Sequence, residues 1–128
     1  MGSTTLVDNY ISTGRAVLKA LDDAGVDVRT AFWLYNPDAA EWRLRLTMPL
    51  VDREGPMVGY RRVQRVLSKK HLAVPVWTIQ VVGSSDELSK RLRTLVRTER
   101  RALGGIRFSH NSIGNTYIED AYIYRSAA

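Results

Sequence analysis

Apolar residues recur along the chain at two different spacings, and these spacings predict the order of the secondary-structure elements. Residues 6–21 carry apolar side chains at helical spacing, and Gly25 follows as a helix stop signal. Residues 28–35 and 42–48 are rich in aromatic and aliphatic side chains, with the turn-forming sequence Asn-Pro-Asp at 36–38 between them. The first third of the chain therefore predicts a helix followed by a β-hairpin.

The middle of the chain continues with a helix, a strand and a second helix. Gly55 and Pro56 end the hairpin region and precede a helical pattern, and residues 76–82 alternate with the period of a half-buried strand. Ser84 and Glu87 have the spacing of a capping box. Leucines at helical spacing then predict a long helix that runs to Leu103, just before two glycines.

Two closing strands are expected at residues 106–110 and 116–125. Residues 111–115 connect them and contain Gly and Asn, which adopt positive φ angles readily. The element order is then α-β-β-α-β-α-β-β. This order predicts one α+β domain over residues 1–128, with a mainly antiparallel five-stranded sheet and three helices that lie largely on one face.

The composition of the chain excludes several classes of function. A chain of 128 residues is the length of one ordinary domain. The chain contains no cysteine and only two histidines, which excludes a disulfide framework, a cysteine-ligated zinc site and a thiol nucleophile. The phosphate-binding, dinucleotide-binding, serine-hydrolase and zinc-protease motifs are also missing from the sequence. We expect neither a metal nor a cofactor.

The sequence also predicts where the protein resides. Residues 1–6 show no basic segment followed by an apolar run, and no uncharged apolar stretch approaches the length of a membrane span. We therefore expect a cytoplasmic protein with no membrane partner.

The first hairpin suggests a sensory role. Residues 31–37, with the sequence Ala-Phe-Trp-Leu-Tyr-Asn-Pro, run into Trp42, Arg43 and Leu44, and this segment resembles the opening hairpin of GAF-type small-ligand sensor domains. The resemblance covers the hairpin alone. It implies a ligand-sensing or regulatory sheet.

The two faces of this hairpin predict a binding surface. If Tyr35 opposes Trp42 across the six-residue connection, Arg43 and Arg45 lie on the face opposite to Trp33. A one-residue slip in register would reverse that arrangement. Aromatic side chains near arginines predict a site for a small ligand or partner protein, formed by Trp33, Tyr35, Arg43 and Arg45. The alternative is that a covering loop, or a second copy in a homodimer, buries the surplus apolar face.

Basic residues suggest a second function. Residues 53–101 contain twelve Lys and Arg against four acidic residues. If the two helices in this region lie side by side, their arginines form a basic plate suited to a phosphate backbone. This nucleic-acid interface would comprise Arg61, Arg62, Arg65, Arg93, Arg97 and Arg101. The competing interpretation is that these residues form ordinary solvated helix faces.

A third hypothesis is a small ribonuclease-type enzyme. Glu119 and Asp120 interrupt the last strand, and strict alternation would direct one of their carboxylates inward. His110 on the neighbouring strand could pair with that carboxylate and act in general acid–base catalysis, with Arg107 beside it. The competing interpretation is a structural hydrogen-bonded pair.

The three hypotheses rank as follows. The leading one is a small cytoplasmic ligand- or protein-binding regulatory module, homodimeric and not an enzyme. Nucleic-acid binding is the second and the ribonuclease-type enzyme is the third.

Overall fold

The computed structural model describes residues 8–127, with every side chain in that range except that of Val76. The first two positions of the helix predicted from residue 6 lie outside the described residues. The elements in chain order are α1 (Asp8–Asp23), β1 (Thr30–Asn36), β2 (Glu41–Thr47), α2 (Pro49–Glu54), α3 (Pro56–Lys69), a 3₁₀ turn η2 (Val76–Thr78), β3 (Ile79–Val82), α4 (Glu87–Leu95), β4 (Ile106–Ile113) and β5 (Thr116–Ser126).

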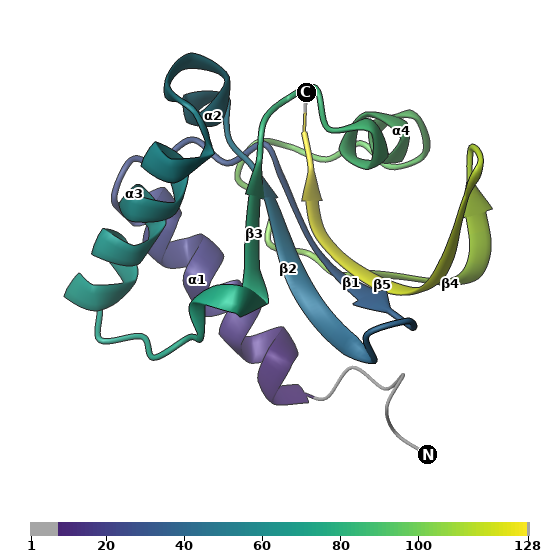
Figure 1. The fold of residues 1–128 in the computed structure, drawn as a ribbon, viewed down its shortest axis with the longest axis horizontal. Helices are drawn as coiled ribbons and strands as arrows, with labels where there is room; N and C mark the ends of the chain where they lie inside the picture. Colours follow the sequence, from purple (N-terminus) through teal and green to yellow (C-terminus); the bar gives the residue numbers. More distant parts are fainter. Residues whose placement is uncertain (1–7, 128) are drawn as a thin grey trace.

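The five strands form one mixed sheet in the order β3-β2-β1-β5-β4 (Figure 1). The pairs β1–β2, β1–β5 and β4–β5 are antiparallel, whereas β2–β3 is parallel. The prediction of an α+β fold with a five-stranded sheet is confirmed, and the parallel pair is the difference. The parallel pair arises because α2 and α3 return the chain to the end of the sheet where β2 begins, so that β3 runs in the same direction as β2.

The register of the first hairpin agrees with the prediction. Tyr35 lies opposite Trp42 and Trp33 opposite Leu44, so Arg43 and Arg45 lie on the other face of the sheet. The turn is closed locally, because the backbone N–H of residue 38 donates to the side-chain oxygen of residue 36 at 3.0 Å.

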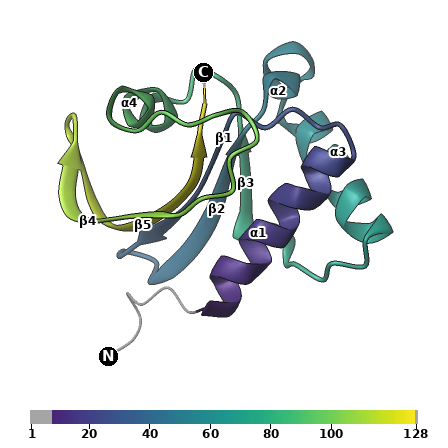
Figure 2. The ribbon, with the colours of Figure 1, turned by 180° about the vertical axis from the view of Figure 1, so that it is seen from behind.

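Helices cover both faces of the sheet. In Figures 1 and 2, α1 and α3 lie on one side of the sheet and α4 lies on the other, within the curve formed by β4 and β5. The expectation that the helices lie largely on one face is therefore wrong for α4. The curved strands give the leucines of α4 an apolar surface to pack against, which is why the helix docks there.

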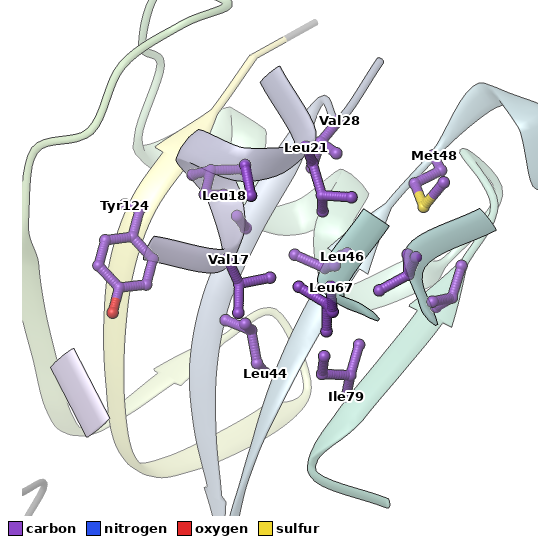
Figure 3. Close-up of a cluster of buried hydrophobic side chains, with 14 of the residues drawn as sticks. Val17, Leu18, Leu21, Val28, Leu44, Leu46, Met48, Leu67, Ile79 and Tyr124 are labelled. Atoms are coloured by element: carbon purple, nitrogen blue, oxygen red, sulfur yellow. The ribbon is translucent and has the colours of Figure 1, made fainter. Parts of the chain in front are cut away.

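The main core lies between the sheet and the pair α1 and α3. Figure 3 shows Val17, Leu18 and Leu21 of α1 close to Leu44 and Leu46 of β2. A second, smaller core lies beneath α4. Its buried members are Phe32, Leu92, Ile113, Ile118, Ala121 and Ile123.

One helix, α2, was not predicted, whereas α3 begins at Pro56 as expected. Helix α2 occupies residues 49–54, between the predicted second strand and Pro56, where the sequence predicts no element. Both α2 and α3 begin with a proline, Pro49 and Pro56, at a position where a missing backbone N–H costs nothing. Prolines that indicated the end of a strand therefore also begin helices.

The last helix is shorter than predicted. Asp86 caps α4 by accepting a hydrogen bond from the Ser89 N–H at 3.1 Å, so the cap is not the expected pair Ser84 and Glu87. The helix ends at Leu95 and Val96 is extended, and the Thr98 N–H then donates to the carbonyl of Ser126 at 2.9 Å. Pairing with the end of β5 thus replaces the last two predicted turns of helix.

Two buried polar contacts tie α1 to β5. The Tyr124 hydroxyl donates to the carbonyl of Ile11 at 2.6 Å and accepts from the Trp33 indole N–H at 3.0 Å. Burial raises the pKa of Tyr124 to about 12, although the bond from Trp33 acts in the opposite direction. Nearby, Arg125 binds both carboxylate oxygens of Asp22.

Across residues 8–127, no helix combines the length and the apolar character that a bilayer crossing requires.

Candidate ligand-binding groove

A groove of about 370 Å³ lies on the same face of the sheet as α4. Strands β1, β2, β3 and β5 and the first hairpin all contribute to it, and Figure 2 shows how β5 and β4 curve away from the flat part of the sheet. Its lining residues are Leu34, Tyr35, Asn36, Pro37, Ala39, Glu41, Arg43, Arg45, Gln80, Thr116, Tyr117 and Ile118.

Arg45 is held rigidly at one side of the groove. Its guanidinium donates to the side-chain oxygen of Gln80 at 3.2 Å and to both oxygens of Asp86 at 3.3 and 3.2 Å. The guanidinium also lies over the ring of Phe32, 6.0 Å from its centre. Because Asp86 also caps α4, this ion pair fixes the position of α4 relative to β2 and β3.

Arg43 is the accessible cation of the groove. Its side chain is 45% exposed, and both its Nε and Nη2 donate to a single oxygen of Glu41, at 3.1 and 2.8 Å. In the part of the chain that the structure describes, its Nη1 has no hydrogen-bond partner. Arg43 therefore keeps donors available for a ligand.

The opposite side of the groove is apolar. Leu34 and Ile118 provide aliphatic surface, and Tyr117 stands at the rim with 58% of its surface exposed. The Tyr117 hydroxyl lies 3.4 Å from Nδ1 of His110 on the adjacent strand. The groove thus combines one accessible cation, several hydrogen-bonding groups and an apolar wall, as small-molecule sites commonly do.

The four residues predicted for a ligand site are only partly brought together. Arg43 and Arg45 line the groove, and Tyr35 also borders it although this residue is only 5% exposed. Trp33 is fully buried on the other face, where its ring lies 5.4 Å from that of Tyr10. The expectation that Trp33 forms part of an exposed aromatic surface is wrong, because α1 covers its face of the sheet.

The structure also separates the residues of the enzyme hypothesis. Asp120 is the buried carboxylate, and it binds Arg107 (2.6 Å to Nε) and the Ser109 hydroxyl (2.7 Å), not His110. Burial would raise the pKa of Asp120, but the hydrogen bonds from Arg107 and Ser109 lower it below its usual value.

The alternation that this hypothesis assumed breaks at His110, whose φ of 51° lies in the left-handed region. His110 is exposed, and its contact is with Tyr117. Glu119 is half-buried. The predicted pairing of His110 with Glu119 or Asp120 is therefore wrong, and the competing interpretation, a structural pair, fits Asp120 with Arg107 as its partner.

The basic plate of the nucleic-acid hypothesis does not form as predicted. Helix α3 carries Arg61, Arg62 and Arg65, and α4 with its continuation carries Arg93, Arg97 and Arg101. Because α3 and α4 lie on opposite faces of the sheet, their arginines do not make one flat surface (Figure 1).

Two groove residues, Gln80 and Tyr117, were not singled out in the sequence. Gln80 enters the groove because β3 pairs with β2 in parallel, which aligns Gln80 with Arg45. The alternation of residues 76–82 was the only available signal for Gln80, and it shows which residues share a face but not which strand is the neighbour.

Across residues 8–127, no group of three or more His, Asp or Glu side chains lies close enough together to hold a metal ion. No protein-family model, curated protein or solved structure matches the chain.

Proposed function

We propose that the protein is a small-ligand-binding module, and that its groove takes a compact amphipathic molecule bearing a carboxylate. The observation that carries the proposal is the position of Arg43, an exposed arginine with free donors beside an apolar wall. A volume of about 370 Å³ falls at the lower end of the range for drug-sized ligands.

The charges in the groove favour an anionic group at Arg43 over one at Arg45. Arg45 is already neutralised by Asp86, and both side chains are only 17% exposed. The pair formed by Arg43 and Glu41 is exposed, and such pairs contribute little stability because water screens them. A ligand carboxylate can therefore use the planar guanidinium of Arg43 at small cost.

The apolar wall determines the rest of the ligand. Leu34 and Ile118 favour an aliphatic or aromatic body, and the exposed ring of Tyr117 can cover one side of it. Burying this body against the wall would stabilise the complex through the hydrophobic effect, while the carboxylate fixes its orientation.

Isothermal titration calorimetry with paired probes tests this chemistry. The first pair is 4-phenylbutyrate and its uncharged amide, followed by a panel of other aromatic carboxylates with their amides. We expect acids to bind more tightly than amides, and R43Q to remove this preference. R61Q changes the charge equally at an exposed position on α3 and should leave it intact.

The apolar contact has its own variant. Y117A should weaken both members of each pair, whereas W77A, which removes a similarly exposed ring outside the groove, should weaken neither. The proposal is overturned if no acid of the panel binds, or if R43Q retains the full preference for acids.

The predicted homodimer remains a prediction. The homodimer is predicted from an apolar sheet face that a second copy would bury. In the structure, α1, α3 and α4 of the same chain pack against both faces of the sheet. Light scattering at several protein concentrations checks the oligomeric state, and a concentration-independent monomer mass would reject the dimer.

A further inference from the structure

A second candidate site lies at the end of the sheet where β2, β3 and β5 end. Figure 1 shows α2 and α4 at this end, on either side of the sheet. We name it the basic edge and define it by five arginines: Arg53 on α2, Arg62 on α3, Arg93 on α4, and Arg100 and Arg101 in the connection from α4 to β4.

Pockets between these arginines show that they share one region. One pocket of about 310 Å³ is lined by Arg100 and Arg101, and a smaller one of about 120 Å³ is lined by Arg53 and Arg62. Both pockets include residues 25–27 of the loop between α1 and β1. The two pairs of arginines therefore flank the same loop, although they come from different elements.

The electrostatics of this loop agree with that placement. A side-chain hydrogen bond from Arg29 lowers the pKa of Asp27, and the charges of Arg100 and Arg53 lower it further. Arg93 joins the edge through a third pocket, of about 210 Å³, which it lines together with Arg29.

The acidic groups at this edge are mostly occupied. Asp27 binds Arg29 through both carboxylate oxygens at 2.8 Å, Asp22 binds Arg125, and Asp52 accepts hydrogen bonds from Ser84. Two exposed acids remain, Glu54 and Glu99, and each is adjacent in the sequence to an arginine of the edge, Arg53 and Arg100.

The five arginines of the basic edge are not neutralised by carboxylates. Among the described residues, none of the five forms an ion pair, and Arg101 donates only to the carbonyl of Asp22. Adjacent unneutralised cations repel one another, so an anion that binds several of them at once relieves that repulsion. Arginine binds phosphate oxygens in a bidentate manner, which suits a row of phosphates.

We infer that the basic edge binds the phosphate backbone of double-stranded nucleic acid without reading its sequence. The exposed aromatic side chains of the described chain are Tyr10, Trp77 and Tyr117, and none of them lines the three pockets of the edge. Single strands usually bind through base stacking on such rings, so their absence from the edge favours a duplex.

Fluorescence anisotropy with a labelled duplex DNA, and with one of its strands alone, tests this inference. Five phosphate contacts predict a loss of affinity of about 500-fold between about 50 and 200 mM salt, from a slope of about 0.9 per contact. R53Q/R62Q/R100Q should weaken duplex binding at least about tenfold and reduce the salt slope by about 2.7. R65Q/K69Q/K70Q, an equal charge change toward the other end of α3, should change both only slightly.

Several results would overturn the inference. These are equal losses in the two triple variants, no duplex binding by the wild-type chain at low salt, tighter binding of the single strand, or binding to anionic phospholipid vesicles but not to the duplex. If the first triple variant unfolds more easily than the wild type, R53Q/R100Q replaces it, because both of its positions are exposed. Both R53Q/R62Q/R100Q and R53Q/R100Q should still bind aromatic carboxylates in the groove as the wild type does. A loss of duplex binding can therefore be distinguished from a failure of the proposed function.

Discussion

Replacing Arg125 by methionine tests how strongly the end of β5 holds the rest of the fold. The Arg125 side chain is 1% exposed and binds the two oxygens of Asp22 at 3.0 and 2.7 Å. It also donates to the carbonyls of Val28 and Ala102, at 3.0 and 3.1 Å. It therefore joins α1, the loop before β1 and the connection after α4.

The expected cost of R125M is about 3 to 5 kcal/mol of unfolding free energy. Methionine retains the apolar stem, so the loss comes from the groups that Arg125 leaves behind. Asp22 is 11% exposed and would keep a charge without its counter-ion, and the two carbonyls would lose their donor. The double variant D22N/R125M should cost less than the sum of its single variants, because no uncompensated charge remains.

Urea unfolding followed by tryptophan fluorescence measures these costs. We expect a lower midpoint and an unchanged slope. K19M is the matched control, because Lys19 pairs with Asp23 in the last turns of α1 at 3.8 Å with both side chains exposed, and its loss should cost under about 1 kcal/mol. The reasoning fails if R125M costs no more than K19M, or if D22N and R125M are additive.

Three further variants test other contacts of the core and sheet. In the same urea assay, G14A should lower the unfolding free energy by about 2 kcal/mol, because a β-carbon at residue 14 would overlap the Tyr124 hydroxyl. The control G104A places its β-carbon in open space and should change the unfolding free energy by less than about 0.5 kcal/mol. Y124F should cost about 1 to 3 kcal/mol at neutral pH. Because the folded pKa of Tyr124 is raised to about 12, wild-type stability should fall as pH rises from about 10 to 12, and a matching fall in Y124F would contradict this assignment. D120N should cost about 1 kcal/mol, because Arg107 is partly exposed and water screens its ion pair with Asp120. Since the folded pKa of Asp120 is lowered, the difference in stability from wild type should be present above about pH 4 and vanish as acid protonates Asp120. A difference that persists in acid would argue against the ion pair.

Short-range features of the fold could be predicted from the sequence because local chemistry determines them. The register of the first hairpin follows from two-residue alternation and the length of its connection. The length of α4 could not be predicted this way. Leu95 continues the leucine pattern yet is 58% exposed, and Leu103 packs against the main core on the other face of the sheet. The leucines are spaced as in a single helix, but Leu103 belongs to a different part of the fold from the leucines of α4.

The candidate sites depended on longer-range pairings. Arg43 and Arg45 were correctly assigned to one face, but their groove exists only because β3 adds Gln80 and β5 curves to bring Tyr117 to the rim. Pairing of distant strands and the curvature of a sheet are decided by tertiary contacts, which a single sequence does not specify. The same limit applies to His110, whose left-handed φ shifts the alternation that the enzyme hypothesis assumed.

The net charge alone does not show where an anion would bind, because several of the arginines are paired with acidic residues. Among residues 8–127, four arginines each bind one aspartate, in the pairs Arg29–Asp27, Arg45–Asp86, Arg107–Asp120 and Arg125–Asp22. A paired arginine contributes little to the field at a distance, because its charge is cancelled nearby. Among the described residues, five of the arginines that form no ion pair lie at one end of the sheet, although they come from different elements. The partners of the arginines, more than their number in a helix, indicate where an anion should bind.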